Sequence, residues 1–147
     1  AARGNISAQR VHNSEAWKRS EIPAANGHSD ARSLARVYGV LGCGGELEGV
    51  SVLSPEAIAE STTEQSAQPD AFMGAPTRIA LGFRLSHDGN MGPNPRSFGH
   101  RGAGGSIGFA DPGRRIGFGY VMNQMKADLP GETSTGARLI NALYSAL

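Results

Sequence analysis

The chain has 147 residues, a length that fits one domain with a single hydrophobic core. Its 14 basic and 13 acidic side chains give a formal net charge of +1, which leaves no electrostatic argument for binding nucleic acid or an anionic membrane. No apolar run reaches the roughly 20 residues that span a bilayer. The single cysteine, Cys43, excludes an internal disulfide and argues against a disulfide-stapled secreted scaffold, so the compartment stays open with a cytoplasmic one favoured.

The first part of the chain predicts an irregular lead-in followed by two helices. Residues 1–28 show no sustained apolar period, and the sequence begins without methionine or a signal core, so we expect a processed chain or a piece of a longer one. An apolar stripe at i, i+3, i+4 and i+7 then predicts a helix from Ser29 or Asp30 to Gly42. Ser54 as cap and a proline in the first turn predict a second helix that ends near Thr62.

The second part predicts a sheet and a final helix. Residues 63–77 have the composition of a loop, and residues 78–85 predict a strand. From Phe98 to Met122 we expect two or three antiparallel strands, with a reverse turn at residues 111–114. The last helix is predicted from about Thr133 to Leu147. This order favours the α+β class, with an antiparallel sheet and flanking helices.

Glycines are concentrated between Gly99 and Gly108 and recur at Gly117 and Gly119. Glycine weakens a strand and offers no side chain for packing. Such a concentration predicts that another group approaches the main chain closely, and we expect that group to be the acyl part of a substrate.

Two side chains in this stretch carry possible chemistry. Ser106 lies in a Gly-X-Ser-X-Gly pattern, which marks a nucleophile only where a strand turns sharply into a helix. Here the following residues continue as a strand, so we interpret Ser106 as a small strand residue. His100 begins the glycine-rich strand, where a functional and a purely structural role both stay open. The four histidines and Cys43 show no metal-ligand spacing, so no metal site is predicted.

Several short blocks occur in a characteristic order along the chain. They are Pro23-Ala24-Ala25-Asn26-Gly27-His28, Leu53-Ser54-Pro55-Glu56, Leu81-Gly82-Phe83, Gly99-His100-Arg101-Gly102-Ala103-Gly104-Gly105-Ser106 and Phe109-Ala110-Asp111-Pro112. Their order resembles the serine β-lactamase-like carboxylesterases, which are related to class C β-lactamases and penicillin-binding proteins. The resemblance runs from about residue 20 to the C-terminus. It implies the C-terminal part of a β-lactamase/transpeptidase-like fold, in which residues 1–77 end the helical region and residues 78–147 form the last strands and the final helix.

The resemblance also implies a site. His100-Arg101-Gly102 matches the His-X-Gly form of the family's third active-site motif, on the strand that walls the catalytic cleft. The backbone N–H of Ala103 would then supply half of the oxyanion hole, and His100 and Gly102 would contact the substrate. Asn26 would lie at the rim of the cleft as a further substrate-binding residue. No cofactor is implied.

Two motifs of that family are missing from these 147 residues. No serine has a lysine three positions later, and no tyrosine has Asn or Ser two positions later. We therefore expect the chain to be the C-terminal portion of a serine hydrolase that acts on small esters or β-lactams through an acyl-enzyme, and to be inactive alone. Its expected partner is the upstream half of the same enzyme or a second copy, paired along residues 115–122. The alternative is a non-catalytic penicillin-binding-like or ligand-binding module.

Overall fold

The computed structural model describes residues 11–71, 74, 76–125 and 134–147. The chain divides into two compact units, Ala1–Asp30 and Ala31–Leu147, which are described separately. Within these described stretches, no helix is long and apolar enough to cross a bilayer.

The first unit contains a short helix, α2 (Glu15–Arg19), in a segment that was predicted to be irregular. The side chain of Ser14 caps it by accepting a hydrogen bond from the amide of Trp17. The prediction was wrong here because five residues are too few to show an apolar period. The side-chain amide of Asn26 donates to the carbonyls of Trp17 and Ser20, so it joins the following turn to the end of this helix.

The second unit is built on a six-stranded antiparallel sheet in the order β3-β4-β5-β6-β7-β8. Its helices are α3 (Ala31–Gly42), α4 (Pro55–Ser61) and α5 (Thr135–Ser145), and its strands are β3 (Glu64–Ser66), β4 (Ile79–Ala80), β5 (Arg84–Leu85), β6 (Phe98–Arg101), β7 (Ile107–Asp111) and β8 (Ile116–Tyr120). A separate hairpin pairs β1 (Glu46–Leu47) with β2 (Val50–Ser51). This arrangement confirms the α+β class and the three predicted helices.

Two strand predictions differ from the structure. Residues 78–85 form a hairpin instead of one strand, because the chain reverses at Leu81-Gly82-Phe83 and the amide of Ala80 donates to the carbonyl of Phe83 over 2.8 Å. Residues 63–77, predicted as a loop, contain β3. That strand is polar and exposed at every position, so its sequence shows none of the apolar alternation that indicates a strand.

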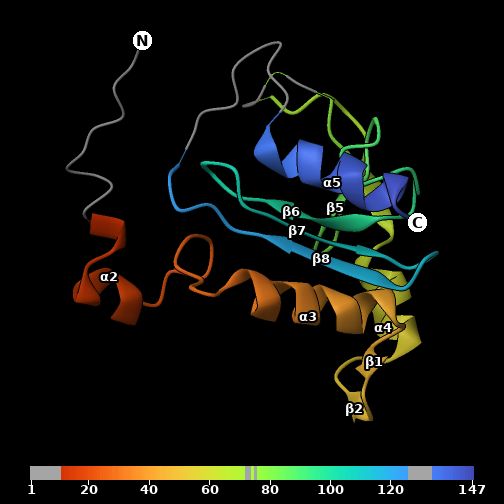
Figure 1. Ribbon diagram of the computed structural model, residues 1–147, viewed down its shortest axis with the longest axis horizontal. Coiled ribbons are helices and arrows are strands. Elements are labelled where there is room, and N and C mark those ends of the chain that lie inside the picture. The colour runs from red at the N-terminus through yellow and green to blue at the C-terminus, as the bar shows by residue number, and fades with distance from the viewer. Residues whose placement is uncertain (1–10, 72–73, 75, 126–133) are drawn as a thin grey trace. The chain divides into compact units, whose positions relative to one another are not determined.

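Helices cover both faces of the sheet (Figure 1): α3 lies along β8 on one face, and α5 lies on the other. Strand β7, which lies between β6 and the edge strand β8, is buried at all of its positions. Its Ile107 and Phe109 pack with Ile140 of α5, whereas Ala110 belongs to the cluster on the opposite face. The core therefore has two layers, one on each side of β7.

The glycines of β8 allow α3 to approach the sheet backbone to backbone. A methyl group added to Gly117 would lie 2.1 Å from the amide nitrogen of Gly39 and 2.3 Å from the carbonyl oxygen of Ala35. One added to Gly119 would lie 2.5 Å from the carbonyl oxygen of Ala31. These distances are too short for any side chain, so the helix can occupy this position only because both strand residues are glycine.

On β7, Gly108 makes room for the ring of Tyr38 in the same way, since an added methyl group would lie 2.2 Å from its Cε2 atom. Burial beneath the helix raises the pKa of Tyr38. The expectation that these glycines leave the main chain bare for a substrate acyl group is therefore wrong for Gly108, Gly117 and Gly119. The group that approaches them is α3.

Candidate functional site

The connection between β6 and β7 is a tight turn over residues 102–105. The amide of Gly105 donates to the carbonyl of Gly102 over 3.2 Å, which places Ala103 and Gly104 at the two central positions. Gly104 has a φ of +87°, and a positive φ at the third residue is what a type II turn requires. Below the turn, the amide of Gly102 donates to the carbonyl of Ser106 over 2.8 Å and closes the hairpin.

The backbone N–H of Ala103, at the tip of this hairpin, has no hydrogen-bond partner within the described part of the chain. Ala103 is exposed, and its amide makes no hydrogen bond to any residue that the structure describes. In a type II turn the N–H of the second residue is not used by the turn itself. The turn thus leaves this amide without a hydrogen-bond partner among the described residues, on an exposed residue.

His100 and Gly102 lie on the same strand end as Ala103. His100 is exposed on β6, directly opposite Gly108 of β7. Gly102 is exposed as well, but a methyl group added there would lie 2.2 Å from the Oγ atom of Ser106. A side chain at this position would therefore have to displace the hydroxyl of Ser106, whereas the Cβ atom of Ser106 lies at an ordinary contact distance of 3.6 Å.

Ser106 does not form a nucleophile elbow. It directly precedes β7, and the chain continues as a strand from Ile107, so no helix begins at the serine. This agrees with the interpretation of Ser106 as a small strand residue.

Asn26 belongs to the first unit, and the other three predicted site residues belong to the second. Its amide group is engaged with the carbonyls of Trp17 and Ser20, and its own carbonyl lies 2.8 Å from Nδ1 of His28. Asn26 stays a prediction as a substrate contact.

Asp111 joins the far end of β7 to three other segments. Its carboxylate is fully buried and accepts hydrogen bonds from Tyr144 (2.6 Å), Asn94 (2.5 Å) and the amides of Gly113 (2.9 Å) and Arg114 (3.2 Å). Burial alone would raise the pKa of Asp111, but these hydrogen bonds outweigh it and lower the pKa. Asp111 was interpreted from the sequence as a turn residue. The bond to α5 was not foreseeable, because nothing local to Asp111 indicates it.

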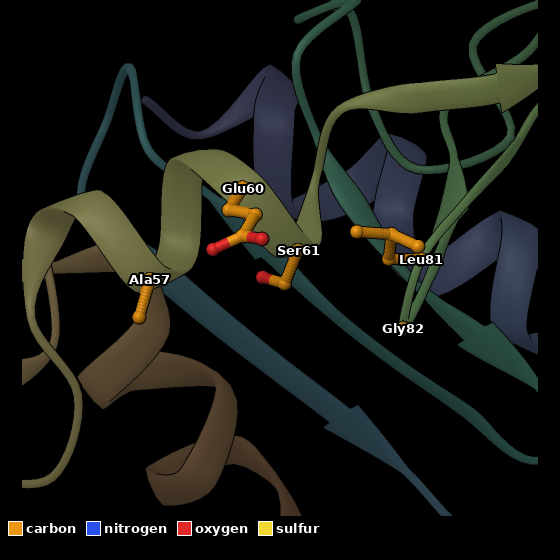
Figure 2. Close-up of a pocket in the computed structure, with 5 residues that line it drawn as sticks. All are labelled: Ala57, Glu60, Ser61, Leu81 and Gly82. Carbon is orange, nitrogen blue, oxygen red and sulfur yellow. The ribbon is translucent and has the colours of Figure 1, made fainter.

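A pocket of about 260 Å³ lies elsewhere, between α4 and the turn that joins β4 to β5. Figure 2 shows Leu81 on that turn, across from the end of α4 that carries Glu60 and Ser61. The pocket is open to solvent and contains none of the predicted site residues. Among the residues described, no three His, Cys, Asp or Glu side chains gather closely enough to hold a metal ion.

The comparison with known proteins decides the family. The family model described as Beta-lactamase matches residues 1–142 of the chain. The chain belongs to the beta-lactamase family.

Individual members of the family show how much of the protein this chain represents. It is 40% identical over 111 residues to the esterase/beta-lactamase LipL of Mycobacterium tuberculosis. This alignment covers 75% of the chain but only 25% of LipL. The crystal structure of a family VIII carboxylesterase matches 94% of the chain at a TM-score of 0.88 and 44% identity, and the chain covers 37% of it. A penicillin-binding protein homolog from Caulobacter crescentus matches 89% of the chain at a TM-score of 0.83 and 40% identity, with 35% of that protein covered.

The chain spans about a quarter to two fifths of the lengths of these relatives. One residue near the hairpin tip, Met125, was missed by the sequence analysis. Its only signal is an isolated methionine a few residues beyond β8.

Proposed function

We propose that this chain supplies the cleft-wall strand and one oxyanion-hole donor of a serine hydrolase that cleaves small carboxylic esters through an acyl-enzyme. The observation that carries the proposal is the exposed N–H of Ala103, which has no hydrogen-bond partner among the described residues and follows directly on His100-Arg101-Gly102. The identity to the family VIII carboxylesterase and to the esterase/beta-lactamase LipL supports an ester substrate.

In the proposed mechanism each residue of the hairpin has a separate task. A serine outside these 147 residues attacks the ester carbonyl, and the negative charge that develops on the carbonyl oxygen is stabilised by the N–H of Ala103. His100 orients the substrate from the neighbouring position on β6. Gly102 contributes by leaving the approach to the turn free of a side chain. Water then hydrolyses the acyl-enzyme.

The first experiment removes the donor without disturbing the turn. Proline is favoured at the second position of a type II turn, so Ala103→Pro preserves the backbone path and deletes only the N–H. In the complete protein we expect kcat for a nitrophenyl ester to fall by about 10²–10³-fold, the usual loss of one oxyanion donor. Ala103→Ser keeps the N–H and serves as the matched control. Equal activities of the two variants would contradict the proposal.

Ser106→Ala completes this experiment. We expect it to retain ester hydrolysis, because Ser106 lies at a strand start. Loss of a nucleophile lowers kcat by about 10⁶-fold, so a drop of that size would restore Ser106 as the attacking group.

The second candidate is a penicillin-recognising module that binds without turnover. The 40% identity to the penicillin-binding protein homolog favours it. A labelled fluorophosphonate separates the two, because it tags the complete protein at a serine outside this chain if the protein is an esterase and tags nothing if the protein only binds.

A further inference from the structure

The side chain of Met125 lies flat against the turn that carries Ala103. A methyl group added to Gly104 would lie 2.7 Å from Cβ, 2.7 Å from Cγ and 2.8 Å from Cε of Met125. Both ends of the methionine side chain therefore follow the surface of the turn. Yet Met125 is 45% exposed, so its opposite flank faces solvent.

This position brings an apolar surface next to the proposed oxyanion donor. Ala103 and Gly104 are consecutive, and neighbouring Cα atoms lie about 3.8 Å apart. Met125 therefore contacts the residue directly after the one whose amide is proposed to bind the ester carbonyl. The other side chain of the turn, that of Ala103 itself, is a single methyl group and offers little apolar contact.

We propose that Met125 contacts an apolar chain of the bound ester and so favours substrates with chains longer than methyl. This inference rests on the proposed function. The chain can belong to the acyl or to the alcohol part of the ester, since both flank the carbonyl group. Methionine suits such a contact because its unbranched, polarisable side chain adapts to different shapes, so the expected preference is broad.

The test compares two ester series in the complete protein. One series lengthens the acyl group of nitrophenyl esters, and the other lengthens the alkyl group of acetate esters. For Met125→Ala we expect the ratio of kcat/KM for long over short chains to fall about fivefold in one of the series, as loss of contact with one or two methylene groups implies. The series that responds identifies the part of the ester that Met125 contacts.

Two further variants make the test specific. Met125→Leu keeps an apolar side chain of similar volume and should retain most of the preference. Leu139→Ala removes an apolar side chain of comparable exposure (43%) from α5, far from the turn in sequence, and should leave the ratio unchanged. Thermal unfolding of each variant shows whether it is folded. The rate at which fluorophosphonates of different alkyl length label each variant measures the chain-length preference without turnover.

The outcomes separate this inference from the proposed function. A chain-length ratio in Met125→Ala that is unchanged or raised in both series would overturn the role of Met125 while ester hydrolysis stands. So would an equal loss for all chain lengths, which would indicate that Met125 only supports the turn. A wild-type protein that hydrolyses no ester and takes no fluorophosphonate label would instead refute the proposed function itself.

Discussion

Asp111 shows at the scale of one residue how a buried charge is kept in this fold. Four donors surround its carboxylate: Tyr144, Asn94 and the amides of Gly113 and Arg114. In Asp111→Asn, the charge is lost and an NH₂ group replaces one carboxylate oxygen, so at least one of these four donors loses its acceptor. We expect a loss of about 2–3 kcal/mol in the free energy of unfolding, measured by urea titration. The control is Asp88→Asn, an exposed position whose change should cost less than about 0.5 kcal/mol.

The same carboxylate gives a prediction for pH. Because folding lowers the pKa of Asp111, its ionised form stabilises the folded protein above the pKa of the unfolded chain, about 4. That contribution is lost as the pH falls below this value toward the lower pKa of the folded state. Urea titrations between pH 3 and 7 should therefore show a shallower loss of stability in acid for Asp111→Asn than for the wild type. Parallel curves would show that Asp111 does not contribute to the acid sensitivity.

At the scale of the element, the glycines of β8 set the distance between α3 and the sheet. Gly117→Ala places a methyl group 2.1 Å from a backbone nitrogen of α3, and backbone cannot move aside as a side chain can. We expect a loss of about 1–3 kcal/mol in stability, measured by thermal or urea unfolding. Gly82→Ala is the matched control, because nothing lies within 4 Å of the added methyl group. If both variants were equally stable, the close approach of α3 would not be what excludes a side chain at position 117.

Helices α3, α4 and α5 and the β6–β8 meander could be predicted from the sequence because their signals are local. Ser54 with Pro55 marks the start of α4, and the Asp111-Pro112 turn separates β7 from β8. The polar strand β3 gave no such signal. The role of the glycines was misassigned because the sequence shows that something approaches Gly117 but cannot show whether it is a ligand or a helix.

The candidate site divides in the same way. Ala103 and Gly102 could be predicted from the resemblance to a family, and the turn geometry around them follows from Gly104, whose positive φ is unfavourable for other residues. Met125 could not be predicted, because its contact with the turn joins segments that are 21 positions apart in the sequence. Such contacts depend on how the sheet is assembled and have no local pattern.

At the scale of the whole molecule, the sheet ends in β8. This strand pairs with β7 on one side, and no strand among the described residues pairs with its other side. Edge strands present unpaired backbone groups that favour association with another chain. We therefore expect the 147-residue chain, expressed alone, to form dimers or larger species, measured by light scattering coupled to size-exclusion chromatography. A compact, monodisperse monomer across micromolar concentrations would contradict this expectation.

The hairpin that carries Ala103 extends from paired strands β6 and β7, and the side chain of Met125 contacts its turn at Gly104. β7 pairs with β6 on one side and with β8 on the other. A strand that docks along the outer side of β8 therefore restrains β7 through β8. Thermal motion at the tip should therefore shrink when that docking occurs. Docking at β8 would then also hold the amide nitrogen of Ala103 in a better-defined position. Assembly and catalytic activity would therefore increase together.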